Sequence, residues 1–229
     1  LGFISLVKVT GTDETTTIEG LAEDRSVILQ ATTKTPVADF MGTFGMPNLD
    51  KLGVILRIPE YAENANISIN TQERNGEQVP VGIAFSNASG DFKNDYRFMA
   101  SEIINEKLKT VKMRAVNWGI EFEPSVASIQ RFKFMISANS EETTFIAKTE
   151  GGDLKFYFGD HSTHAGSFDF AKGIAGALKH AWSWPVAQVQ AILGLDGKLT
   201  MKISDQGAMQ ITVDSGLAEY NYILPAQSK

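Results

Sequence analysis

Apolar and polar residues alternate along two stretches in the two halves of the chain. Residues 81–90 read VGIAFSNASG, and residues 207–216 read GAMQITVDSG. The alternation puts every second side chain on one face, which is typical of a half-buried strand, and each stretch ends in a Ser-Gly turn. The segment after each turn carries a tyrosine at the same place, Tyr96 and Tyr222. Both stretches therefore predict a pair of antiparallel strands.

Helical spacing appears just before these strands in both halves. PNLDKLGVIL at 47–56 and PVAQVQAILG at 185–194 each start with proline, which suits the first helical position. Apolar residues three and four apart follow, and a segment predicted as a strand comes after each helix, at 65–70 and 198–204. The stretch at 125–139, SVASIQRFKFMISAN, also has helical spacing, and its serine suits an N-cap.

The front of each half predicts a hairpin. ETTTI at 14–18 resembles ETTFI at 142–146, and SVILQ at 26–30 resembles LKFYF at 154–158. On this alignment the counterpart of the helix at 125–139 begins before residue 1. We therefore expect LGFISLVKV to be the end of a helix in an N-terminally truncated first domain.

Each half is thus expected to contain a helix, a hairpin, a strand, a second helix and three strands. The spacing between matched segments changes along the chain, which predicts an insertion at 171–184 and a longer hairpin at 71–80. We predict domains at 1–100 and 122–229, joined by an extended crossover at 101–121. Chance likeness between β-rich segments is the alternative, but five segments that match in the same order favour duplication.

Composition narrows the class of protein. The 229 residues include no cysteine, which excludes a disulfide framework or thiolate metal site and favours an intracellular protein. No apolar run approaches the roughly 20 residues that a membrane helix needs, so no membrane partner is expected. The net charge of −6 argues against a domain that holds nucleic acid by phosphate neutralisation alone.

The order of these segments resembles the DNA sliding clamps, which are processivity factors of DNA polymerases. The ending GLAEYNYILPAQSK is similar to the last strand and tail of archaeal and eukaryotic clamps. The spacing of WPVAQVQAIL, GKLTMKIS and GAMQITVDS is similar to that family's final helix and strands. The two-domain length and acidic charge are similar to clamps of tailed bacteriophages. The linker departs from the resemblance because it lacks the proline-rich character of some phage clamps, and the insertion at 171–184 is unusual.

The resemblance implies an α+β fold of two tandem clamp-type domains, each with two helices against antiparallel sheets. It implies a homotrimeric ring around duplex DNA, with a DNA polymerase and a clamp loader as partners and with no cofactor. Helices would line the hole, and edge strands of neighbouring subunits would pair. A ring holds DNA by topology, which reconciles a net charge of −6 with a DNA-linked function.

The resemblance also implies two sets of site residues. The basic residues expected to face DNA are Lys8, Lys51, Arg131 and Lys133 on predicted helices and Lys179 in the insertion. A solvated helix face is the alternative for them. The residues expected to form a partner groove are Tyr222, Ile223, Leu224 and Pro225 on one wall and Val111 and Met113 on the other. A final strand that only packs on the core is the alternative, and the tail AQSK is expected to stay mobile until a partner binds.

Other candidate chemistry is sparse. His161 and His164 lie with Asp160 in DHSTHAG, a spacing that could hold a metal, but no third ligand is evident and a polar loop is favoured. We find no glycine-rich phosphate loop, nucleophile elbow or catalytic carboxylate pair, so we expect no enzyme. Two other classes stay open: a duplicated β-rich virion or assembly protein, and an enzyme with its site built in the loops.

Overall fold

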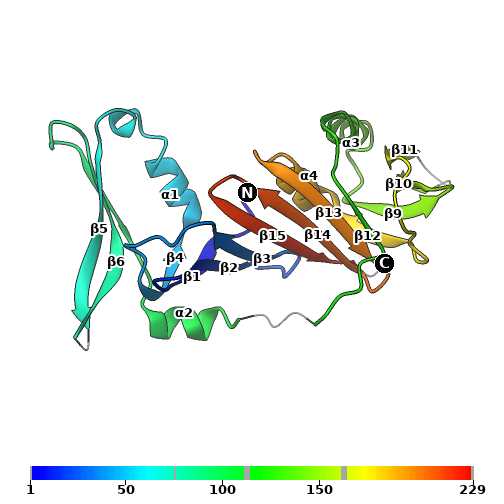
Figure 1. Ribbon diagram of the computed structural model, residues 1–229. Helices are drawn as coiled ribbons and strands as arrows, with labels where there is room; N and C mark the ends of the chain where they lie inside the picture. The colour runs from blue at the N-terminus through cyan, green and yellow to red at the C-terminus, as the bar shows by residue number, and fades with distance from the viewer. Residues whose placement is uncertain (1, 75, 111–113, 161–163, 228–229) are drawn as a thin grey trace. The chain divides into compact units, whose positions relative to one another are not determined.

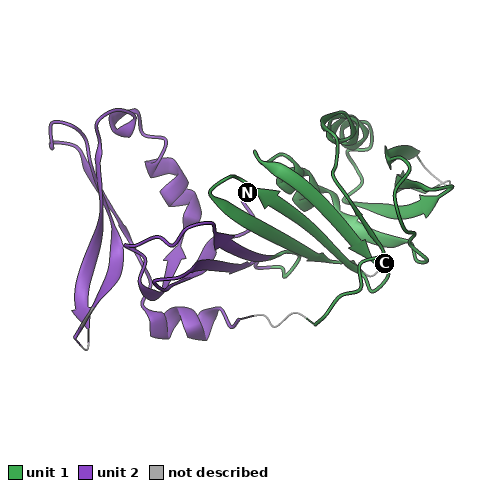
Figure 2. Cartoon of the chain, in the orientation of Figure 1, with its two compact units in different colours: residues 1, 24–28, 112–229 green, residues 2–23, 29–111 purple. Residues whose placement is uncertain are grey.

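The computed structural model describes the chain except for residues 1, 75, 111–113, 161–163 and 228–229, together with the side chain of residue 77. The chain forms two compact units (Figure 2). Unit 2 holds residues 2–23 and 29–111, and unit 1 holds residues 1, 24–28 and 112–229. Both units combine helices with antiparallel strands, which confirms the predicted α+β class.

The first sheet of unit 2 has the strand order β4-β1-β2-β3 (Figure 1). Its strands are β1 (Leu6–Gly11), β2 (Thr16–Leu21), β3 (Ile28–Thr33) and β4 (Gly42–Pro47). β1 pairs antiparallel with both β2 and β4. Val7, Val9 and Phe44 project from one face of this sheet and are buried.

The remainder of unit 2 is a helix, a three-stranded meander and a second helix. These elements are α1 (Leu49–Ile55), the 3-10 turn η1 (Pro59–Tyr61), β5 (Asn66–Arg74), β6 (Glu77–Ser86), β7 (Lys93–Arg97) and α2 (Ser101–Lys107). Ile55, Tyr61, Phe85 and Tyr96 form one buried cluster between α1 and the meander. β5 and β6 are longer than their counterparts in unit 1, which confirms the predicted longer hairpin.

Unit 1 has a four-stranded sheet in the order β11-β10-β9-β12 and a second group in the order β15-β14-β13-β8. Its elements are β8 (Ile120–Phe122), α3 (Val126–Ala138), β9 (Thr144–Glu150), β10 (Asp153–Gly159), β11 (Ala165–Ala171), β12 (Trp182–Pro185), α4 (Val186–Leu193), β13 (Lys198–Ser204), β14 (Ala208–Asp214) and β15 (Ala218–Pro225). The Ser125 hydroxyl caps α3 by accepting the Ser128 N–H at 3.0 Å, as the sequence predicts. Phe132 of α3 is fully buried among phenylalanines of β9, β10 and β11.

The register of strand pairing shows that both units repeat one plan. Leu6 pairs with Pro47 in unit 2, and Thr144 pairs with Pro185 in unit 1, so both partners are displaced by the same 138 residues. The β1–β2 and β9–β10 hairpins are related by the same displacement. In the meanders, Ile83 opposes Tyr96 and Ile211 opposes Tyr222. Each tyrosine thus lies in the third strand of its meander opposite an isoleucine, their exact equivalence stays a prediction, and burial raises the pKa of each to about 12.

The same register corrects the alignment at the front of the halves. Residues 6–11 form the strand β1, so the prediction of a helix there is wrong. By its register β1 is the counterpart of β9. Residues 171–184 correspond to 33–46 at the 138-residue spacing, so they are not an insertion. The repeated letters ETT caused both errors, since a short identical run carries less information than pairing along a whole strand. Within the described part of unit 2, no helix corresponds to α3.

The predicted crossover is also partly helical. Ser101–Lys107 form α2, where an extended segment was expected. Ile104 and Leu108 lie four residues apart, which puts them on one side of a helical turn, and both are buried. Ile104 lies against Gly45 of β4, where any larger residue would collide with it. Burial of this pair accounts for a helix that the sequence pattern did not indicate.

Candidate functional site

Three of the predicted DNA-facing cations lie on helices. Lys51 is exposed on α1, Arg131 is exposed on α3, and Lys133 is half-buried on α3. The Arg131 guanidinium donates to the Asp169 carbonyl oxygen at 3.2 Å and lies 5.3 Å from the centre of the Phe168 ring. These contacts hold its charge at a fixed place on the surface of unit 1, so less side-chain entropy is lost when an anion binds there.

The same helices also expose apolar side chains. Val54 on α1 is 56% exposed, and Val126 and Phe134 on α3 are 85% and 64% exposed. Arg131 is the one charged side chain among the exposed residues of α3, and α1 exposes Asp50 beside Lys51, so the net positive charge of both faces is small. Such faces can attract phosphates only weakly.

Lys8 does not belong to a helix surface. It lies on β1, is only 5% exposed, and its Nζ is 3.0 Å from Glu19 Oε2 and 2.6 Å from Thr110 Oγ1. The prediction that Lys8 projects from a helix toward DNA is wrong, because its ammonium group is used inside unit 2. A buried lysine needs such partners, since an unpaired buried charge is strongly destabilising.

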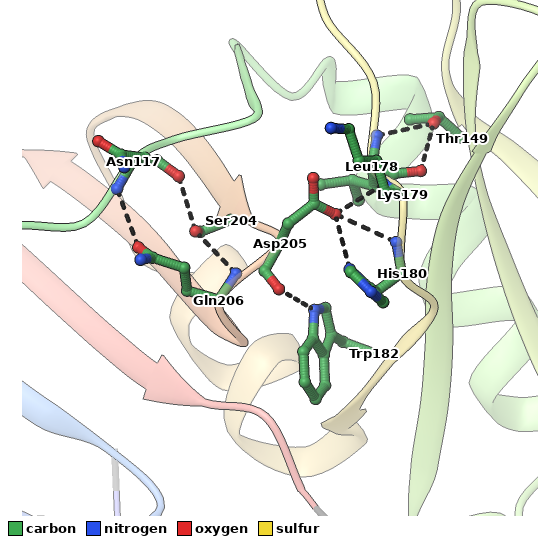
Figure 3. Close-up of polar contacts among 9 residues, drawn as sticks. All are labelled: Asn117, Thr149, Leu178, Lys179, His180, Trp182, Ser204, Asp205 and Gln206. Atoms are coloured by element: carbon green, nitrogen blue, oxygen red, sulfur yellow. Dashed lines mark hydrogen bonds and ion pairs between the residues drawn. The ribbon is translucent and has the colours of Figure 1, made fainter.

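Lys179 lies in the segment between β11 and β12, and it is exposed. Its backbone N–H donates to Asp205 Oδ1 at 2.6 Å, and the next N–H, of His180, donates to the same oxygen at 3.1 Å (Figure 3). The Asp205 carbonyl oxygen accepts the Trp182 Nε1–H at 3.1 Å. The turn between β13 and β14 thus fixes the segment that carries Lys179.

The same turn holds the chain that enters β8. The Ser204 hydroxyl donates to the Asn117 carbonyl oxygen at 2.7 Å, and the Asn117 N–H donates to Gln206 Oε1 at 3.1 Å (Figure 3). Gly207 closes the turn with a φ of 75°, and its carbonyl oxygen accepts the Ala226 N–H at 2.8 Å. Three segments far apart in sequence therefore meet at residues 204–207. The motif SDQG predicts a turn, but nothing in the sequence indicates these partners.

The C-terminal strand presents less surface than expected. Tyr222, Ile223 and Leu224 are 6%, 5% and 0% exposed, and Pro225 is exposed. The first three side chains are buried, as the core alternative predicts, and because consecutive residues of a strand point to opposite faces, both faces of β15 are covered there. Of these four residues, Pro225 alone is exposed to a ligand.

The tail expected to be mobile is tied down at its start. The Ala226 N–H is bonded to Gly207, and the Gln227 N–H donates to the Ser183 carbonyl oxygen at 2.9 Å. The prediction of a free tail is therefore wrong for these two residues. The opposite wall of the predicted groove, Val111 and Met113, lies outside the described residues.

The described residues hold no cluster of three histidine, aspartate or glutamate side chains arranged to bind a metal. His161 lies outside that part of the chain, and His164 is exposed. Among the same described residues, each helix is too short or too polar to cross a bilayer.

The sequence matches no protein-family model, and no curated protein matches it in sequence. Its fold does match a solved structure, described as the C-terminal region of FEN-1 bound to A. fulgidus PCNA. The TM-score is 0.69, the identity is 11%, and the match covers 98% of this chain and 90% of that chain. At this identity the likeness shows the fold alone. The chain has the α+β fold of a PCNA-type clamp, which confirms the predicted fold class.

Proposed function

We propose that this chain is the subunit of a sliding clamp that encircles duplex DNA and tethers a DNA polymerase. The observation that carries the proposal is the clamp-type fold over 98% of the chain. Two domains in each of three chains would close a six-domain ring with cyclic symmetry. The protein would act as a scaffold, without enzymatic activity or a cofactor, and a loader would place it on DNA.

The cations Lys51, Arg131 and Lys133 are the proposed DNA contacts. They are sparse, and Val54 and Phe134 stand exposed on the same helices. A ring retains DNA by enclosing it, so weak phosphate contacts are sufficient and leave the ring free to slide. Changing all three cations to glutamate should reduce clamp-dependent DNA synthesis and lower the melting temperature only slightly, because Lys51 and Arg131 are exposed and Lys133 is half-buried.

The proposed partner surface is the turn at 204–207 and the segments it holds. Pro225, Gln206 and His180 are exposed there, and the chain entering β8 lies beside them. The similar solved PCNA is described with a FEN-1 segment bound. Lys179 belongs to this surface by its bond to Asp205, so we assign it to partner binding instead of DNA.

The test combines mass with topology. Light scattering should give about 75 kDa, three times the 25.0 kDa chain. Protein loaded on linear DNA with both ends blocked should be retained and should be released when one end is cut free. A monomeric mass, or equal retention on both DNAs, would contradict the proposal.

One observation favours a second candidate, an assembly protein without a DNA role. Val126 and Phe134 expose apolar surface on α3, as interaction surfaces often do. Such a protein would form oligomers but would show no dependence on blocked DNA ends, so the same experiment separates the two functions.

A further inference from the structure

The two units carry corresponding residue pairs on one face of their first sheets. Lys8 opposes Glu19 across β1 and β2, and Ile146 opposes Tyr157 across β9 and β10. Both positions are displaced by 138 residues, so the two pairs occupy the same place in the repeated plan. We call these surfaces the Lys8 face of unit 2 and the Ile146 face of unit 1.

The Lys8 face is covered by the chain that follows β7. Met99 forms a bridge with Gly45, and α2 then places Ile104 against Gly45. The residues after α2 lie over the ion pair of Lys8 and Glu19. There the Thr110 hydroxyl donates to Glu19 Oε2 at 3.1 Å, while Lys8 Nζ donates to Thr110 Oγ1. Ile104 and Leu108 are 0% and 7% exposed, so they are the apolar anchors of this cover.

The Ile146 face begins in the same way but is hollow. Ser183 occupies the place of Gly45 and forms the equivalent bridge, with Gln227. Beyond that bridge the described residues leave a cavity of about 430 Å³. The residues that line it and matter here are Ile146, Lys148, Tyr157, Ala165 and Ala181.

We propose that the Ile146 face binds a short helical segment of a partner protein, seated as α2 and Thr110 are seated on the Lys8 face. The segment would carry two apolar side chains four residues apart, as Ile104 and Leu108 are. A second copy of this chain cannot supply residues 104–108, because both anchors are already buried in unit 2. We assign the site to a segment of another protein.

The replaced pair defines one further property of that segment. Ile146 stands where unit 2 has Lys8, and Tyr157 stands where it has Glu19. An ion pair suits the hydroxyl of Thr110, whereas an isoleucine beside a tyrosine ring favours an apolar side chain. The partner should thus carry an aliphatic residue two positions after its second anchor.

The rim of the cavity is already neutralised. Lys148 Nζ lies 2.7 Å from Glu150 Oε1 and 4.3 Å from the centre of the Tyr157 ring. Glu150 also accepts the Tyr157 hydroxyl at 2.7 Å. Because these charges are paired, apolar contact should determine affinity, and binding should depend little on salt.

The probe is a fluorescein-labelled peptide with the sequence of residues 100–110, ASEIINEKLKT, with valine in place of the final threonine. Fluorescence anisotropy should show saturable binding to the full chain. Ile146→Lys should weaken it about tenfold, since it puts a charge where an apolar contact forms. The matched control is Ile67→Lys, which changes an isoleucine 53% exposed on β5 and should leave the affinity unchanged.

A photo-crosslinker added after the last peptide residue should label residues in β9 or β10. No saturable binding, equal weakening by both variants, or crosslinks only to β1 and β2 would overturn the proposal. Circular dichroism and the melting temperature establish that Ile146→Lys is folded. The proposal does not rest on the ring, because peptide binding and oligomer mass are measured separately.

Discussion

The first sheets of the two units share a register and are covered by helices on different faces. In unit 1, α3 places Phe132 against the phenylalanines of β9, β10 and β11. In unit 2, α2 places Ile104 against Gly45, on the opposite face from the buried Val9 and Phe44. Backbone pairing fixes the register, whereas the side chains decide which face a helix can cover. A duplicated plan can therefore keep its strands and change its helix packing.

The two covers also differ in chemistry. The cluster around Phe132 is aromatic and wholly apolar, with ring centres 5.1 Å apart for Phe132 and Phe145. The cover in unit 2 combines an aliphatic anchor with the Lys8–Glu19 ion pair. Aromatic burial stabilises a unit more than a partly exposed ion pair does, so the two covers should respond differently to substitution.

The largest expected effect is in the aromatic cluster. Phe132→Ala should lower the free energy of unfolding by about 4 kcal/mol, because it removes a fully buried ring and leaves a cavity. Urea unfolding followed by circular dichroism measures this change. Phe134→Ala is the matched control, since that side chain is 64% exposed and should change stability by less than about 0.5 kcal/mol. Similar losses in both variants would mean that α3 does not cover this sheet with Phe132.

A swap of residue pairs tests whether the covers are interchangeable. Lys8→Ile alone should cost about 2 kcal/mol, because it leaves the partly buried Glu19 carboxylate without its cation. Adding Glu19→Tyr imports the Ile146–Tyr157 pair and removes the unpaired charge, so the double variant should recover about half of that loss. Thermal unfolding of both variants gives the difference. If the double variant is less stable than the single one, the two positions are not equivalent in their packing.

The sequence predicted the meanders better than the first sheets. Alternation at 81–86 and 207–214 identified β6 and β14, because each strand has one buried and one half-exposed face. β1 was misassigned, since Leu6, Val7 and Val9 lie in an apolar stretch whose spacing fits both a helix and a strand. Lys8 also misled the prediction, because a lysine is normally exposed and this one is buried beside Glu19 and Thr110. Pairing with β2 and β4 resolves the ambiguity, and pairing is not visible in a single segment.

The candidate site was less predictable than the fold. Asp205 has an ordinary turn sequence, and its partners Lys179 and His180 lie about 25 residues away in the chain. The burial of Tyr222 and Leu224 depends on what covers β15, which composition does not indicate. Lys51 and Arg131 are exposed, which fits both the predicted DNA-facing role and its alternative of a solvated helix face, so exposure alone does not separate the two.

The smallest expected effect compares Tyr96 and Tyr222 at alkaline pH. Burial raises the pKa of Tyr96 and of Tyr222 to about 12, above the ordinary value of 10.0. The neutral rings therefore stabilise the fold fully below pH 10, and that contribution is lost as the pH rises from about 10 to about 12. Replacing either tyrosine with phenylalanine removes its titration, so the free energy of unfolding should fall by roughly 1 kcal/mol less between pH 7 and pH 11.

The two variants should differ at neutral pH, because the Tyr96 hydroxyl donates to the Pro47 carbonyl oxygen. Tyr96→Phe loses that bond, at a cost of about 1 kcal/mol. Urea unfolding at pH 7 and at pH 11 measures both effects. An unchanged alkaline slope in both variants would show that other groups govern unfolding there and that the shared burial of these tyrosines does not.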